Sequence, residues 1–195
     1  MPFGVGFFGK THMQRTHHIR LMAKYNQWMN DNLFTAAQCL SHEQLTADQG
    51  AFFKSILGTL NHIAVGDTIW LKRFAGHPAN HVEWQSLHAL TPLSGLNHAL
   101  FNTLPELAAH RTMLDAQIIR WTDTITEADL DQTLVYANMK GAVMHKNLFA
   151  LLMHFFNHQT HHRGQVSTLL SQNGVDFGDT DLVLLIPDET PNNAK

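Results

Sequence analysis

The sequence lacks the features that mark several large classes of protein. Its single cysteine, Cys39, cannot form an internal disulfide, so a reducing compartment fits the chain. Lys and Arg number 13 against 16 Asp and Glu, which is not the basic balance of a nucleic-acid-binding protein. No apolar run approaches the roughly 18 residues of a membrane span, and the N-terminus has no signal-peptide pattern. We therefore expect a soluble, cytoplasmic protein with neither nucleic acid nor membrane as partner.

Charged residues are also scarce, at 15%, whereas apolar residues reach 44%. A chain of 195 residues can bury a sizeable core, and no linker, repeat or low-complexity segment divides it. We expect one domain spanning residues 1–195. Cys39 falls in a helical pattern and is expected to be a small buried apolar side chain, not a nucleophile.

Histidine is the residue in excess. The chain has 15 of them, more than Lys and Arg combined. Histidine is the commonest metal ligand and the usual proton shuttle. This surplus favours a metal site without locating it.

Four long segments space their apolar residues as helices do: residues 17–39, 52–74, 103–124 and 146–172. "SHEQ" at residues 41–44 is typical of a cap or turn, Thr103 suits an N-cap, and Asn173-Gly174 suits a helix end. β-branched and aromatic residues on both sides of residues 138–141 favour a small hairpin before the last helix. The pattern predicts an all-α four-helix bundle, with the "LVLLIP" tail as an extended segment over its edge.

The last helix carries "HFFNHQTHHRGQV" at residues 154–166. At about 100° per residue, His162 lies inside the apolar arc and His158 at its edge, whereas His154 and His161 face solvent. The i, i+4 spacing lets His158 and His162 meet one metal ion. The alternative is two histidines at the core edge, bonded to backbone or water. Gln165 falls about 20° from His158 and is expected to line the same pocket.

Two charged residues fall on apolar stripes of different helices. Arg163 lies between apolar positions of the last helix, and Asp67 shares a stripe with the core residues of the second. A buried charge needs a partner of opposite sign, so we expect an ion pair between Asp67 and Arg163. The alternative is that both reach solvent at the end of the bundle.

His62, in "TLNHIAVGDTIW", lies nearly opposite Phe53 on the predicted second helix and therefore off its main apolar stripe. Gly58 and Gly66 flank it at i−4 and i+4. A glycine inside a helix costs about 1 kcal/mol relative to alanine. The two glycines therefore indicate clearance for a close helix or for a ligand beside His62.

Three segments together resemble one family. They are "YNQWMN" at residues 25–30, "LNHIAVGDTIW" at 60–70 and "NHQTHHRGQ" at 157–165, and they resemble the DinB/YfiT-like family of metal-dependent proteins over nearly the whole chain. The resemblance implies an up-down-down-up four-helix bundle with a long crossover connection. It also implies a divalent metal held by three histidines, which correspond to His62, His158 and His162. The helical angles indicate the last two independently, whereas His62 depends mainly on the resemblance.

Characterised members include bacillithiol-dependent transferases and a mycothiol-dependent maleylpyruvate isomerase. The resemblance thus implies a metal- and thiol-dependent S-transferase that acts on small electrophiles and uses a low-molecular-weight thiol. Three imidazoles favour zinc or nickel and also suit iron, manganese or cobalt. The alternatives are a metal-dependent hydrolase, a non-catalytic metal- or small-molecule-binding stress-response protein, and a helical scaffold that binds nothing. Apolar surface on the tail and first helix predicts a homodimer, and the sequence assigns no catalytic residue.

Overall fold

The computed structural model describes residues 14–78 and 99–188 of the chain. The long helices are α1 (Arg15–Ala37), α3 (Ile56–Ala75), α5 (Leu104–Thr124) and α7 (Leu148–Gln172). The short elements are α2 (His42–Thr46), α6 (Glu127–Leu130), strands β1 (Thr133–Ala137) and β2 (Val143–Asn147), and the 3₁₀ turn η1 (Leu182–Leu185). The prediction of a mostly helical chain is confirmed, and so is the hairpin before the last helix.

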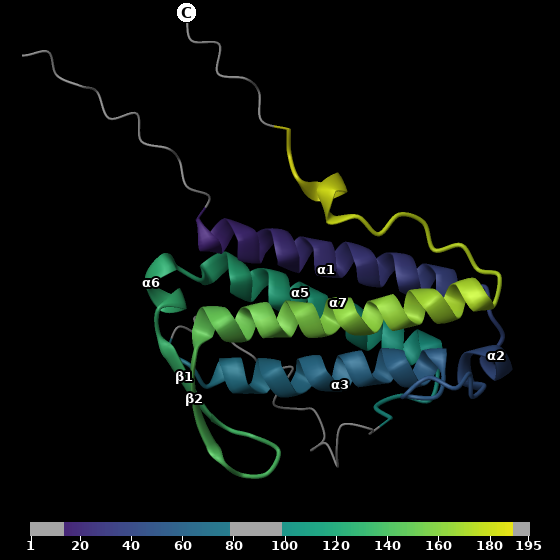
Figure 1. Cartoon of the computed structure of the whole chain (residues 1–195), viewed down its shortest axis with the longest axis horizontal. Helices are drawn as coiled ribbons and strands as arrows, with labels where there is room; N and C mark the ends of the chain where they lie inside the picture. The colour runs from purple at the N-terminus through teal and green to yellow at the C-terminus, as the bar shows by residue number, and fades with distance from the viewer. Residues whose placement is uncertain (1–13, 79–98, 189–195) are drawn as a thin grey trace, which may run out of the picture.

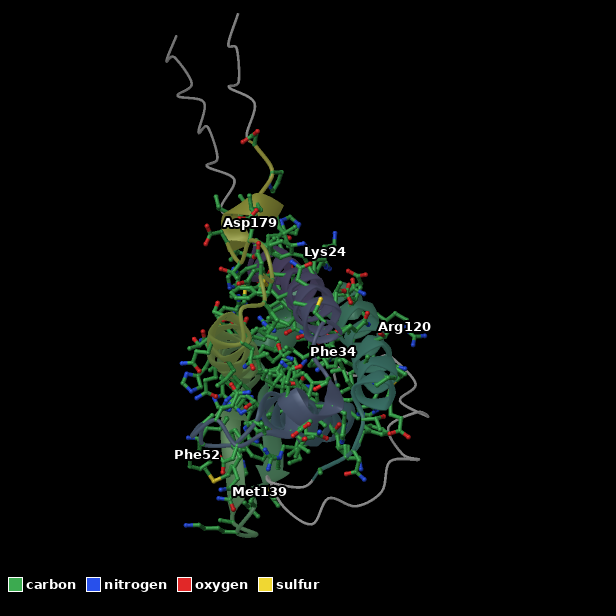
Figure 2. All side chains as sticks on the ribbon, turned by 90° about the vertical axis from the view of Figure 1, so that its right-hand side faces the viewer. Lys24, Phe34, Phe52, Arg120, Met139 and Asp179 are labelled. Atoms are coloured by element: carbon green, nitrogen blue, oxygen red, sulfur yellow. The ribbon has the colours of Figure 1, made fainter. Side chains whose placement is uncertain are left out.

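The four long helices lie side by side around one core, as Figure 1 shows. Helix α1 packs against α5 and α7, and α3 packs against the same two. α1 and α7 run in one direction, whereas α3 and α5 run in the other. Because α3 and α5 point the same way, the chain between them joins opposite ends of the two helices. α3 and α7 are thus antiparallel neighbours, and the histidine motifs lie on these two helices.

Large aromatic side chains lock α7 against α3 and α5. Phe74 of α3 stacks on Trp121 of α5 with ring centroids 4.8 Å apart, and it meets the edge of Phe155 at 5.8 Å. Phe155 and Phe156 are both almost completely buried. They lie three and two positions before His158 on α7, so their burial fixes the rotation of this helix about its axis.

Helix α3 begins at Ile56, later than the apolar periodicity predicted. Residues 51–54 form a tight turn in which the Lys54 amide donates to the Ala51 carbonyl at 2.8 Å, and Lys54 has a φ of 69°. Ser55 is the N-cap and its hydroxyl accepts from the Gly58 amide at 3.0 Å. Phe53 therefore precedes the helix. This correction changes the surroundings of His62.

The buried Asp67 pairs with Arg111, and the prediction of Arg163 as its partner was wrong. An Nη atom of Arg111 contacts the Asp67 carboxylate, and the same guanidinium binds Asp115 through Nε at 3.0 Å. Arg111 lies between Leu107 and Leu114 at helical spacing, a position on the apolar stripe of α5. The position of Arg111 on this stripe indicates its burial from the sequence alone, but the prediction did not include it.

Arg163 contacts neutral groups instead of a carboxylate. One Nη atom donates to Oδ1 of Asn26, the other donates to the Thr160 hydroxyl at 3.2 Å, and the guanidinium lies 5.4 Å from the Tyr25 ring centroid. Asn26 in turn donates to Asp115 at 2.8 Å. The expected burial of Arg163 is confirmed, and Asn26 connects it to the acidic side of the network.

Two smaller expectations need correction. α1 ends at Ala37, so Cys39 lies in the following turn and is exposed. The tail runs beside α1, where the Tyr25 hydroxyl donates to the Thr180 carbonyl at 2.7 Å, but η1 interrupts its extended course. Among the described residues, no helix combines the length and apolarity needed to cross a bilayer.

Candidate metal site

Three histidines from α3 and α7 meet at one point between these helices. Nε2 of His62 lies 3.3 Å from Nε2 of His158 and 3.2 Å from Nε2 of His162. The three candidate ligand atoms all lie within 4.8 Å of one another. His62 and His162 are buried, and His158 is partly exposed. The structure therefore brings together the three histidines that the sequence singled out.

The turn before α3 holds His62 in place. The Phe53 ring stacks on the imidazole of His62 with centroids 3.7 Å apart and an interplanar angle of 17°. Gly58 is required by the same turn, because a Cβ there would collide with the Phe53 carbonyl. His62 is thus a buried residue in a close aromatic contact. Because Phe53 precedes α3, the prediction that His62 and Phe53 lie on opposite sides of one helix was wrong.

Gly66 provides the clearance that the sequence predicted. A Cβ at this position would lie 2.8 Å from Cε1 of His158, closer than such contacts normally come. The His158 ring therefore occupies the space that any larger side chain at position 66 would fill. The neighbouring helix that needs the clearance is α7, and its contacting residue is one of the three histidines.

Gln165 orients His162. Its Oε1 lies 2.8 Å from Nδ1 of His162. A carbonyl oxygen can only accept, so Nδ1 carries the proton and Nε2 presents its lone pair to the other two histidines. Such outer contacts fix the tautomer and ring orientation of histidine ligands. The sequence placed Gln165 beside the pocket, and the structure gives it this hydrogen bond.

Burial favours the uncharged form of His158 and His162. Burial, followed by the nearby imidazoles of His162 and His62, lowers the pKa of His158 to about 3. Burial also lowers the pKa of His162, although the bond to Gln165 opposes this shift. Both rings are therefore uncharged at neutral pH, the state in which imidazole nitrogens bind metals.

The spacing of the nitrogens fits a metal ion. Ligands about 2.05 Å from a tetrahedral zinc ion lie about 3.3 Å from one another, and other late transition metals are similar. The separations of Nε2 of His62 from Nε2 of His158 and of His162, 3.3 and 3.2 Å, agree with that value. No fourth His, Cys, Asp or Glu of residues 14–78 or 99–188 joins this group.

The other histidines of the last-helix motif lie outside the cluster. His154 and His161 are exposed, as their helical angles predicted. The His161 ring lies 4.8 Å from His162, and the His154 ring lies 6.1 Å from His158, so both border the site.

The fold and the cluster together define a class: a helical protein that presents three imidazole nitrogens from two antiparallel helices. The DinB family model matches residues 13–192, and the chain belongs to the DinB family. Protein DinB of Bacillus subtilis (strain 168) is 25% identical over 163 residues, which cover 84% of this chain and 90% of that protein. No solved structure gives a significant match to the chain.

Proposed function

We propose that the chain binds one divalent transition-metal ion through Nε2 of His62, His158 and His162. The observation that carries this proposal is the nitrogen spacing of 3.3 and 3.2 Å, which fits tetrahedral coordination. The neutral state of His158 and His162 and the clearance at Gly66 support it. Zinc and nickel suit the all-nitrogen donor set best, followed by cobalt, iron and manganese.

We further propose that the site is catalytic. Catalytic metal sites keep a position free of protein ligands, and the described residues supply three histidines only. His158 is the partly exposed member of the cluster, so small molecules reach the site from its side. When bound, the metal would supply the positive charge that lowers the pKa of a thiol.

The reaction that fits best is S-transfer from a low-molecular-weight thiol to a small electrophile. The sulfur lone pair forms the new carbon–sulfur bond, and the leaving group departs with the electron pair of the bond that breaks. The thiol proton passes to solvent. In this scheme the buried face of the cluster excludes water, and Gln165 holds His162 in the tautomer that the site needs.

A structural role for the metal is the second candidate. All three histidines come from α3 and α7, so a bound ion would fasten these helices together, as expected of a non-catalytic protein of the stress response. A metal-dependent hydrolase would use the same three ligands and water in place of the thiol. The three candidate functions differ in which substrates the metal-loaded protein converts: a thiol with an electrophile, a hydrolysable substrate, or none.

The metal proposal is tested by substituting pairs of neighbouring histidines, one inside the cluster and one outside it. Metal-free protein is dialysed against zinc, nickel or cobalt, and bound metal is counted for wild type, His162→Ala and His161→Ala. We expect one tightly bound ion in wild type and in His161→Ala, and none in His162→Ala. His158→Ala and His154→Ala form a second pair. Equal binding by all variants would show adventitious surface binding and refute the site.

The catalytic proposal is tested with a small panel of cellular thiols and an alkylating electrophile. We expect conjugation that requires the metal and stops in folded His158→Ala protein. Full turnover after complete metal removal would exclude metal catalysis. Hydrolysis of ester or amide substrates without thiol would instead support the hydrolase.

We also propose that residues 1–195 form one four-helix-bundle domain with a long crossover connection, and that the protein is a homodimer. Val183, Leu184 and Ile186 are each more than half exposed on the tail, which favours association. Light scattering that shows only monomer would contradict the dimer.

A further inference from the structure

The facing surfaces of α3 and α7 carry a series of paired residues that continues beyond the histidine cluster. His62 lies beside His162, and Gly66 lies against His158. One turn further on, the rings of Trp70 and His154 meet edge to face at 5.2 Å. Because the helices are antiparallel, each step of four residues on α3 matches a step of four on α7.

Arg73 lies in the last turn of α3, three residues after Trp70. Its guanidinium lies 4.7 Å from the centroid of the Trp70 ring and 4.8 Å from that of Tyr136. Tyr136 belongs to β1, and Figure 1 shows that the hairpin begins beside the end of α3 and the start of α7. Trp70 and Tyr136 also contact each other, with centroids 5.4 Å apart. Two aromatic rings thus hold the guanidinium in place.

Arg73 has no acidic partner within ion-pair distance among residues 14–78 and 99–188. It is partly buried, and burial lowers its pKa. By contrast, Arg111 of α5, which contacts Asp67 of α3, binds two carboxylates. A partly desolvated guanidinium that is held by aromatic rings keeps its N–H donors for an anion.

The rise along α3 from Gly66, which lies against His158, to Arg73 suits a small molecule. His62, Gly66, Trp70 and Arg73 fall within about 80° of the α3 circumference. Residues 66 to 73 span about 10 Å of helix axis. A ligand with a sulfur at one end and a carboxylate at the other can cover this distance.

We propose that Arg73, held between Trp70 and Tyr136, binds a carboxylate of the thiol substrate while the sulfur lies at the three histidines. This inference rests on the proposed function and adds a substrate class to it, namely thiols that carry a carboxylate about 10 Å from the sulfur. Arg73 is then a specificity-determining residue. Its position in the last turn of α3 also complements the helix dipole, a structural role that is indifferent to ligand charge.

The test uses two thiols that differ only in charge, ω-mercaptooctanoate and ω-mercaptooctanol. Each is titrated into cobalt-loaded protein, and binding is followed by the near-ultraviolet charge-transfer band of cobalt–thiolate. The variants are Arg73→Met and, as a matched charge control on the adjacent exposed residue, Lys72→Met. Arg73→Lys tests whether the planar guanidinium is needed.

We expect Arg73→Met to weaken the binding of ω-mercaptooctanoate by about tenfold, because one charge-assisted contact is lost. The affinity for ω-mercaptooctanol should stay unchanged. Lys72→Met should alter neither affinity, and Arg73→Lys should recover only part of the loss. Equal effects on both thiols, or none on either, would overturn the proposal.

A second arm separates this inference from the proposed function. If wild type gives no charge-transfer band with either thiol, the proposed function fails. Carboxylate binding is then judged in metal-free protein, from the fluorescence difference between wild type and Trp70→Phe. A response to octanoate but not to octanol supports the Arg73 site, and an equal response to both overturns it.

Discussion

Gly66 determines how closely His158 approaches α3. An alanine at this position would normally stabilise the helix by up to about 1 kcal/mol. Here its Cβ would lie 2.8 Å from the His158 ring, so the ring must move away from the other two histidines. The two effects act on different properties, helix stability and ligand geometry.

We therefore predict that Gly66→Ala lowers metal affinity by about 10- to 100-fold, the range typical of misplaced ligands. The melting temperature of the metal-free protein should stay the same or rise. The control is Gly164→Ala on α7, where a Cβ would meet no atom within 4 Å. This control should stabilise the protein and keep its metal affinity, as measured by competition with a chromophoric chelator. Unchanged affinity in Gly66→Ala would contradict the prediction.

The face of a helix on which a residue lies was predictable from the sequence, whereas contacts with an irregular turn outside that helix were not. The helical angles separated His158 and His162 from the exposed His154 and His161. The same method misplaced His62, because its environment depends on a turn that departs from the helix. The Phe53 ring reaches His62 only because residues 51–54 fold back. Apolar periodicity contains no information on that reversal.

The short elements likewise include local contacts that the sequence predicts and long-range contacts that it does not. The capping box of Ser41 and Gln44 at α2 is local and visible in sequence. The cap of α1 is not visible in the sequence, because its capping side chain comes from α6. The Thr16 amide donates to Glu127 at 2.8 Å, and Arg15 donates to the same carboxylate at 2.9 Å. More than a hundred residues of chain separate the two ends of this contact.

The cap on α1 should make stability depend on pH. The Thr16 amide, followed by the Arg15 side chain, lowers the pKa of Glu127 below its usual 4.5. A depressed folded-state pKa stabilises the protein above the unfolded value, and the contribution disappears as the pH falls through the folded value. Glu127→Gln should thus melt below wild type at neutral pH, and the two should converge as the pH falls below the usual value of 4.5 and through the lowered folded-state pKa. A difference in melting temperature that stays constant throughout this acid titration would contradict this assignment.

At the scale of the whole molecule, one buried polar network touches all four long helices. Asp67 belongs to α3, Arg111 and Asp115 to α5, Asn26 to α1, and Arg163 to α7. Burial tends to lower the pKa of Arg111, but Asp115 and Asp67 outweigh it and raise that pKa. Burial raises the pKa of Asp67, and Arg111 opposes this shift. Arg111 is therefore the cation that compensates both buried carboxylates.

Arg111→Met should reduce the free energy of unfolding by about 3–5 kcal/mol, because two buried carboxylates lose their cation. The pKa values of Asp67 and Asp115 should then rise further above their unfolded values. Stability from such groups is lost as pH rises, so the variant should be closer to wild type at acidic pH than at alkaline pH. Denaturant unfolding at several pH values measures this. Replacing Asp67 and Asp115 by leucine in the same protein should recover part of the loss.

This network and the histidine cluster differ in what they hold together, and metal removal separates their roles. The network and the aromatic core connect all four long helices, whereas the histidines connect α3 and α7 alone. Metal-free protein should therefore remain folded, with helical circular dichroism, unlike a zinc finger. Metal at about 1,000 times its Kd should add about 4 kcal/mol of stability, or roughly 10 °C in Tm for a chain of this size. His161→Ala should show the same rise and His62→Ala none. An equal rise in His62→Ala would place the stabilising ion elsewhere, and unfolding on chelation would make the metal part of the fold.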